Sequence, residues 1–369
     1  MPLPERLKYA RDVMSLTLAD VEQRTAIGAS TLSEFENGKR EPRLTQLKEL
    51  ADLYRRSTTF FLDQGPLPQE VVLWRQKPTS PNAESVQADF LRLAEQYRSL
   101  ERWCDNIEEA RLPYASVTQS QFRYAHAEKL AHDFRIKHGL GERPGQSLLR
   151  VSEEICKVKV FHKSFEPRGS AACTYSDRYG TAILLNSNSV RWRRNFDLAH
   201  ELFHLLTWNV FRQGESSSSV ESSDQEEKLA TCFARNLLMP QEPLRIAIDA
   251  YQCAPTELSF DDLFEVARQF DVSVEALLWQ MSFIFNFSKE FVQGRVEQLR
   301  GRMAFWDGRQ PDSPPSRPLR FEALANEALR KGMLSTGKYA EYLGITRRQA
   351  MSLVAQEAPD DAEVQVTHS

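Results

Sequence analysis

Two histidines and a glutamate stand close together in the middle of the chain, in the apolar run 196–206. His200 and His204 are four residues apart. On a helix this spacing puts both imidazoles on one face, so both can reach one zinc ion at about 2.0–2.1 Å. Glu201 follows the first histidine directly, where its carboxylate can lie beside the metal and accept a proton from water. The spacing therefore predicts a metal site with an adjacent general base.

An amphipathic helix with two half-exposed histidines and a solvated glutamate is the simpler alternative for this segment. The flanks argue against it, because a solvated helix face does not normally lie within so apolar a run. The order of residues, H-E-x-x-H, is the zinc-binding pattern of metallopeptidases, in which the glutamate is the general base. The pattern therefore favours a hydrolytic metal site.

Two histidines leave a four-coordinate zinc ion short of one protein ligand, with water in the open position. Glu227 is the candidate, on a helix that returns after His204. Ala230, three residues further on, is small enough to let two helices approach closely. Glu226 and Glu221 are the alternatives. No third histidine follows at the spacing of the longer motif H-E-x-x-H-x-x-G-x-x-H. The expected ligands are therefore two histidines and one glutamate around Zn²⁺, with Mn²⁺ also compatible.

The composition limits the class of protein. The chain has 369 residues, of which 41% are hydrophobic and 27% are charged, the balance of a soluble globular protein with two or three domains. The formal net charge of −4 gives no overall attraction to nucleic acid, so any DNA contact must come from a local patch. Five cysteines without a C-x-x-C pair indicate free thiols in a reducing compartment. No signal sequence or membrane-spanning apolar run is visible, so we expect a cytoplasmic protein with no membrane partner.

Residues 1–63 predict a separate block of five short helices. Gly28 marks a tight turn before the third helix, and Asn37-Gly38 marks its end. The block contains, in order, Arg6-Leu7-Lys8, Ile27-Gly28-Ala29-Ser30, Leu32-Ser33, Glu36-Asn37-Gly38 and Pro42, and through them it resembles the Xre (Cro/C1-type) helix-turn-helix family.

This resemblance implies that the third helix, which opens near Ala29, enters the major groove of DNA. Residues 1–63 hold ten basic and ten acidic residues, and the first turn of this helix has no Arg, Asn or Gln for bidentate base contacts. A helix-turn-helix domain that serves dimerisation or partner docking is therefore the alternative to base-specific DNA binding. The resemblance places three residues toward the bases and three near phosphates: Ser30, Thr31 and Ser33, and Lys39, Arg40 and Arg43, respectively.

The rest of the chain predicts an α+β, mostly helical fold. Four prolines between residues 64 and 82 indicate a linker, although Trp74-Arg75-Gln76 suggests a local contact there. A long amphipathic helix over 83–110 could connect domains or form a homodimer. Three strands expected at 157–161, 171–175 and 181–186 precede the H-E-x-x-H helix, and the edge of such a sheet can bind an extended peptide. The expected regions are 64–120 (linker and long helix), 121–285 (metal-site domain), 286–356 (helical region) and 357–369 (disordered tail).

Four segments within 121–281 resemble motifs of the ImmA/IrrE family of metallopeptidases. They are F-D-L-A-H-E-L-F-H at 196–204, E-K-L-A-T-C-F-A-R-N-L-L-M-P at 227–240, G-T-A-I-L-L-N at 180–186 and V-A-R-Q-F-D-V-S at 266–273. The resemblance implies a zincin-like domain in which Glu227 joins the two histidines as a ligand. Phe203 replaces a usual glycine and is expected to narrow the cleft. Thr231 replaces a frequent asparagine and is expected to change hydrogen bonding around the ligands.

The same resemblance implies regulated proteolysis, in a stress, toxin–antitoxin or phage-defence setting. Family members are paired with or fused to an Xre-type module and cleave a repressor or antitoxin-like partner. We therefore expect a regulatory zinc endopeptidase whose helix-turn-helix domain binds DNA or the protein partner. The alternative is a helix-turn-helix transcription regulator whose metallopeptidase-like domain is a sensor. Tyr175, Tyr179 and Arg194 are the candidates for stabilising the oxyanion.

Overall fold

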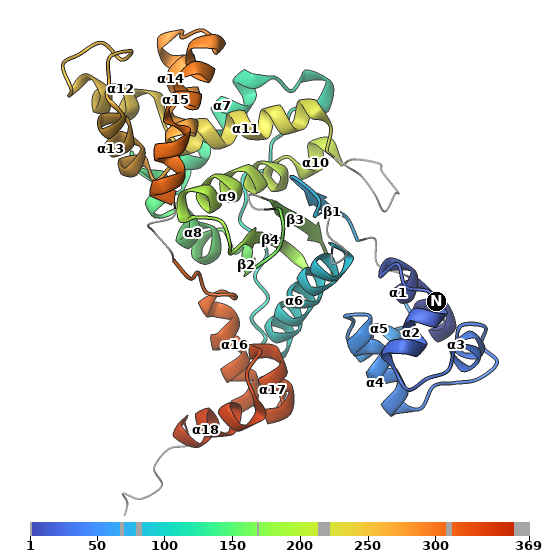
Figure 1. Cartoon of the computed structure of the whole chain (residues 1–369). Coiled ribbons are helices and arrows are strands. Elements are labelled where there is room, and N and C mark those ends of the chain that lie inside the picture. The colour runs from blue at the N-terminus through green and yellow to red at the C-terminus, as the bar shows by residue number, and fades with distance from the viewer. Residues whose placement is uncertain are drawn as a thin grey trace, which may run out of the picture.

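The computed structural model describes residues 2–66, 70–78, 83–167, 170–212, 222–307 and 312–357. A helical N-terminal domain is joined to a larger domain that is built around one small sheet (Figure 1). The predicted α+β, mostly helical fold class is therefore confirmed. Among the described residues, none of the helices combines the length and the apolar character needed to cross a membrane.

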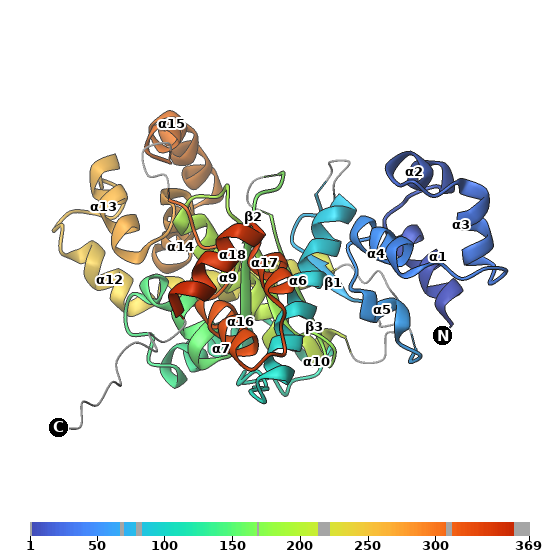
Figure 2. The same cartoon turned by 90° about the horizontal axis from the view of Figure 1, so that it is seen from below.

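Five helices form the N-terminal domain, as predicted. The second begins with a capping box, in which Thr17 and Asp20 exchange hydrogen bonds, and the third runs from the turn at Gly28 to its cap at Asn37. Their apolar faces meet in a core of their own around Phe35. The third helix lies on the outer side of the domain, away from the sheet (Figures 1 and 2). The helices are α1 (Leu3–Val13), α2 (Leu18–Arg24), α3 (Ala29–Glu36), α4 (Leu44–Leu53) and α5 (Thr58–Leu62).

The sheet of the larger domain has four strands in the order β1-β3-β4-β2. The β3–β4 hairpin is antiparallel, β2 joins β4 in parallel, and β1 joins β3 antiparallel. The three expected strands are present with shifted ends, whereas β1 lies in the stretch expected to be a linker. The strands are β1 (Val72–Trp74), β2 (Lys159–Lys163), β3 (Ala171–Ser176) and β4 (Gly180–Asn186).

The two faces of the sheet support different cores, because side chains alternate along each strand. Ile183 of β4 belongs to the core on the face covered by α9 (Arg191–Leu206), and its neighbour Leu184 belongs to the core on the face covered by α6 (Ala83–Trp103). Figure 1 shows α9 and α6 on opposite sides of the sheet. The helix with the two histidines thus lies on a fully buried sheet face.

Further helices cover both cores. α7 (Tyr124–Lys137) and α11 (Asp224–Leu238) pack together, and α11 packs against α9. α16 (Leu319–Arg330) and α17 (Thr336–Leu343) lie on the α6 side. The remaining helices are α8 (Leu148–Arg150), α10 (Trp208–Phe211), α12 (Gln241–Asp249), α13 (Phe260–Phe270), α14 (Val274–Phe285), α15 (Lys289–Asp307) and α18 (Arg347–Glu357), with short helical turns at Gln119–Gln121, Pro144–Gln146 and Val151–Ile155.

Two expectations for residues 64–120 are corrected by the structure. The linker contributes β1 to the sheet, and the helix expected to reach residue 110 ends at Trp103. Asp105 takes a left-handed conformation (φ 53°), and the Asn106 N–H donates to the Glu101 carbonyl at 2.8 Å, which closes the last turn. Ile107 is half-exposed and does not extend the apolar stripe. Disorder was expected for 357–369, but Glu357 is the last residue of α18, and residues 358–369 lie outside the described residues.

Candidate metal centre

The helix α9 carries the H-E-x-x-H segment on its buried half. Every residue from Asp197 to Leu206 is buried, because this half lies between the sheet and α11. α11 begins directly after its N-cap residue Ser223, whose hydroxyl accepts a hydrogen bond from the Glu226 N–H. This start places the two glutamates of the first turn of α11 opposite the two histidines of α9.

The structure brings His200, His204 and Glu227 together. The Nε2 atom of His200 lies 3.0 Å from Oε2 of Glu227, and Nε2 of His204 lies 3.3 Å from Oε1 of the same carboxylate. Each of the three residues offers one possible ligand atom, and these three atoms all lie within 4.8 Å of one another. Ligands of a tetrahedral zinc ion at about 2.0–2.1 Å lie roughly 3.3 Å apart, so the spacing suits this ion.

The charges around His204 also suit a cation. Burial lowers the pKa of this imidazole, but its hydrogen bonds to Glu226 and Glu227 outweigh burial and raise the pKa to about 10. Against the effect of burial, hydrogen bonds with His200 and His204 hold the pKa of the Glu227 carboxyl well below its usual range. Two carboxylates therefore stabilise positive charge at this point, which a metal ion can supply in place of the proton.

Glu226, an alternative candidate for the third ligand, lies behind His204 and does not join the three ligand atoms. Its Oε1 atom lies 2.8 Å from Nδ1 of His204, on the side of the ring opposite Nε2. Arg212 donates two hydrogen bonds to the same carboxylate, at 2.9 and 3.0 Å. Glu226 thus orients His204 and fixes its tautomer, as carboxylates behind metal-binding histidines do. Glu221, the other alternative ligand, lies outside the described residues.

Glu201 lies beside the three ligands with a carboxylate that the protein does not satisfy. Both of its oxygen atoms are buried and have no strong hydrogen-bond donor within the described residues, since only the weak donor Cys173 approaches them. Burial raises the pKa of this carboxyl to about 7, and the Cys173 thiol of β3 is its neighbour. A buried carboxylate without partners is costly. A general base whose partner is the water of a bound metal ion accounts for this arrangement, and a pKa near 7 suits the role.

Arg75 is a residue near the site that the sequence alone did not single out. It follows β1, and its guanidinium forms an ion pair with Asp197, one turn before His200 on α9. Its charge acts on both Glu201 and Glu227. The only signal in the sequence is the Trp-Arg-Gln triplet in a proline-rich stretch, which suggests a contact but not its target.

Phe203 does not narrow the cleft, contrary to expectation. Its ring is fully buried and packs against three phenylalanine rings, with centroid distances of 5.7 Å to Phe233, 5.8 Å to Phe122 and 6.3 Å to Phe211, and against the ring of His204 at 5.9 Å. It therefore fills the core between α9 and its neighbours. Thr231 lines cavities of about 300 and 760 Å³ on the two sides of α11, so a change at this position alters the walls next to Glu227.

The three residues predicted to stabilise the oxyanion each contact groups outside the proposed metal centre. The Tyr179 hydroxyl donates to Glu70 at 2.7 Å, and Arg194 binds Asp312 and the Ser189 carbonyl. Tyr175 packs its ring edge against Trp208 at 6.0 Å. Arg75, whose charge also acts on Glu201, is a further candidate.

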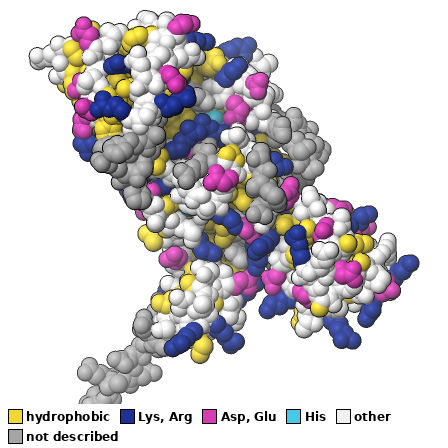
Figure 3. All heavy atoms as spheres, viewed as in Figure 1, with side chains coloured by type: hydrophobic (Ala, Val, Ile, Leu, Met, Phe, Trp, Pro, Cys, Tyr) yellow, Lys and Arg dark blue, Asp and Glu magenta, His cyan; other side chains and the backbone are white. Residues whose placement is uncertain are grey.

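The residues expected to contact DNA lie on the surface of the N-terminal domain. Ser30 is exposed, Thr31 and Ser33 are half-buried, and the basic residues that follow are exposed, with Arg40 3.8 Å from the carboxylate of Glu34. Figure 3 shows basic and acidic side chains interspersed over this domain, in agreement with its neutral charge. The basic residues are Lys39, Arg40 and Arg43.

Comparisons with known families agree with both parts of the chain. Residues 153–282 match the family model of the IrrE N-terminal-like domain. Residues 7–61 match the model of the helix-turn-helix family. A search of curated proteins found no match. The chain is therefore a fusion of an Xre-type helix-turn-helix domain with an IrrE N-terminal-like, metallopeptidase-type domain, which confirms the predicted resemblance.

Proposed function

We propose that this chain is a regulatory zinc-dependent endopeptidase that cleaves a protein partner, a transcriptional repressor or an antitoxin-like protein. One observation carries the proposal: two imidazole Nε2 atoms and the Glu227 carboxylate converge beside the buried carboxylate of Glu201, for which the described residues offer no donor stronger than the Cys173 thiol. A purely structural metal site needs its ligands but not a further carboxylate beside them, such as that of Glu201.

His200, His204 and Glu227 would hold the metal ion, which when bound supplies Lewis acidity and makes water acidic enough to lose a proton near neutral pH. Glu201 accepts a proton from the attacking water and later delivers it to the leaving amine. Burial has already raised its pKa to about 7, so it can both take and return the proton. Glu226 and Arg212 hold His204 in place.

The helix-turn-helix domain supplies DNA or partner binding in this proposal. Its third helix is exposed, with Ser30, Thr31 and Ser33 toward the bases and Lys39, Arg40 and Arg43 near phosphates. We expect the protein to act in the cytoplasm on an Xre-type or antitoxin-like substrate, without a membrane partner. The apolar face of α6 is buried against the sheet and α16, so a homodimer would form through the N-terminal domain instead.

A second candidate function is a transcription regulator whose metallopeptidase-like domain is a sensor. The closure of the site favours it, because His200, Glu201 and His204 are each no more than 2% exposed. This regulator would bind a preferred DNA sequence in a salt-dependent manner, and an intact metal site would not be needed.

A cleavage assay with Glu201→Gln distinguishes these functions. The candidate substrates are any Xre-type repressors or antitoxin-like proteins that neighbouring genes encode. We expect the variant to keep its metal and to lose cleavage, while Glu242→Gln, a matched change of an exposed glutamate on α12, cleaves at the wild-type rate. Cleavage by Glu201→Gln at the wild-type rate would refute the peptidase.

A further inference from the structure

The strand β1 covers the edge of the sheet that lies closest to the proposed base. Leu73 of β1 pairs directly with Cys173 of β3, and the Cys173 thiol is a neighbour of the Glu201 carboxylate. Leu73 and Cys173 belong to the core on the α9 face. Extended peptides bind proteins by adding a strand to a sheet edge. The chain therefore places one of its own segments along the edge from which an extended peptide could reach Glu201.

Side-chain contacts hold β1 in addition to its short ladder. The strand has three residues, and Val72 and Trp74 are only half-buried. The Arg75 N–H donates to the Ala171 carbonyl at 3.1 Å, and Arg75 pairs with Asp197 of α9. The Trp74 indole donates to Gln87 of α6 at 2.9 Å. A strand this short is stable only as long as such anchors persist.

The N-terminal domain holds the other end of the segment. Glu70, which precedes β1, is buried and accepts hydrogen bonds from both terminal nitrogens of Arg56, one of them at 2.7 Å. The Tyr179 hydroxyl of the β3–β4 hairpin donates to the same carboxylate at 2.7 Å. Arg56 itself lies over the Phe60 ring, 5.0 Å from its centroid. A movement of the N-terminal domain would thus pull on Glu70 and on β1.

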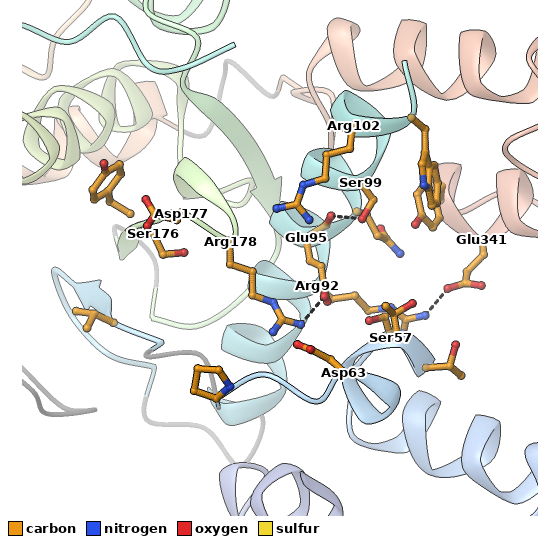
Figure 4. A pocket seen from close by; sticks show the side chains of 18 of the residues that line it. Ser57, Asp63, Arg92, Glu95, Ser99, Arg102, Ser176, Asp177, Arg178 and Glu341 are labelled. Carbon is orange, nitrogen blue, oxygen red and sulfur yellow. Dashed lines mark hydrogen bonds and ion pairs between the residues drawn. The ribbon is translucent and has the colours of Figure 1, made fainter. Parts of the chain in front are cut away.

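The contact between the two domains is narrow enough to permit such a movement. A cavity of about 1240 Å³ lies between them, with Ser57 and Asp63 of the N-terminal domain on one side and Glu95 and Arg178 on the other (Figure 4). Two ion pairs join the domains beside it, Arg55 with Asp89 and Arg92 with Asp52, each at 3.6 Å. Charged pairs around a cavity, rather than a continuous apolar interface, connect the domains, and such contacts break more easily.

We propose that residues 70–76 are an internal pseudosubstrate, which occupies the edge of β3 until the N-terminal domain releases Glu70. The inference rests on the proposed peptidase function and adds its regulation and substrate class. Leu73 and Arg75 project to the α9 face, so the edge accepts an extended peptide with an apolar residue and, two positions later, a basic residue. Binding of DNA or a partner to the N-terminal domain would free the edge for this peptide.

A reversible disulfide tests whether β1 must leave. The bond from the Arg75 N–H to Ala171 puts Val72 and Thr174 in a non-hydrogen-bonded pair, whose Cα atoms lie about 4.5 Å apart. This distance suits a disulfide. The full chain with Val72→Cys and Thr174→Cys locks β1 on β3 when oxidised and frees it when reduced, and Thr174→Cys alone is the control.

The probe is a labelled synthetic peptide with the sequence Val-Val-Leu-Trp-Arg-Gln-Lys of residues 71–77, and binding is measured by fluorescence anisotropy. Two further variants weaken the strand, Leu73→Ser at its apolar anchor and R56M/E70M at its link to the N-terminal domain. The double change removes the ion pair without leaving a buried charge unpaired. All proteins also carry Glu201→Gln, so binding is read without hydrolysis, and a failed pseudosubstrate is distinguishable from a failed peptidase.

We expect the oxidised disulfide protein to bind the peptide at least tenfold more weakly than the same protein after reduction. Leu73→Ser and R56M/E70M should bind it at least tenfold more tightly than the parent protein. Equal affinities before and after reduction, or no saturable binding to Leu73→Ser, would overturn the pseudosubstrate. An unchanged affinity of R56M/E70M would overturn the role of the N-terminal domain.

Discussion

Replacing Glu226 with glutamine should weaken zinc binding without removing a ligand. The Glu226 carboxylate contacts Nδ1 of His204 at 2.8 Å and accepts two hydrogen bonds from Arg212, and its side chain and that of His204 are no more than 3% exposed. Glutamine keeps the shape and one acceptor oxygen but loses the charge that makes His204 a better ligand and positions Arg212.

The size of the effect follows from the place of Glu226 behind a ligand. Changes at such positions reduce metal affinity by roughly 10- to 100-fold, which corresponds to about 1.4–2.8 kcal/mol. Glu227→Gln should weaken zinc binding more, because it alters a proposed ligand itself. Glu242→Gln, on the exposed side of α12, should leave the affinity unchanged.

Competition with a chromophoric zinc chelator measures the three affinities directly. Circular dichroism of the metal-free proteins checks that each variant is folded. The expected order of zinc affinity is Glu242→Gln, then Glu226→Gln, then Glu227→Gln. If a folded Glu226→Gln protein bound zinc as tightly as the wild type, Glu226 would have no part in holding His204 for a metal ion.

Three further predictions concern stability. Phe203→Gly should lower the free energy of unfolding by about 4–6 kcal/mol, because it empties a buried ring site and adds a helical glycine; a loss below about 1 kcal/mol in urea denaturation would contradict the packing described. Arg56→Met alone should cost about 3–5 kcal/mol, because it leaves Glu70 buried without its partner, whereas R56M/E70M should cost much less; equal losses would count against the buried pair. Burial lowers the pKa of His162 from 6.5 to about 4. Between these two pH values the unfolded chain binds a proton that the folded chain does not, so the free energy of unfolding should fall as the pH drops from about 6.5 to 4. His162→Gln should flatten this part of the stability–pH curve, and an unchanged curve would refute the assignment.

The local parts of the fold could be predicted from the sequence. The five N-terminal helices and the histidine helix α9 follow from apolar spacing and cap residues, which depend on neighbours a few positions away. The spacing of His200 and His204 on one helix face is likewise a local property. The returning helix with Glu227 was also expected, since its position depends on a loop and one packing contact.

The remaining features depend on contacts between distant segments. β1 has only three residues between prolines, so its pairing with β3 has no periodic signal. Glu226 and Glu227 are about 100° apart on α11, and only the rotation of that helix decides which one faces Nε2 and which one faces Nδ1 of His204. The position of Arg75 beside Asp197 in turn follows from the β1 register.

The metal content of the purified chain tests the central claim most directly. Native mass spectrometry after incubation with zinc should show one zinc ion per wild-type chain, one per Glu201→Gln chain and none per His204→Ala chain at the same zinc concentration. This outcome would place the ion on the proposed ligands and separate binding from the base. A wild-type chain without zinc, or a His204→Ala chain that keeps it, would contradict the proposed metal centre.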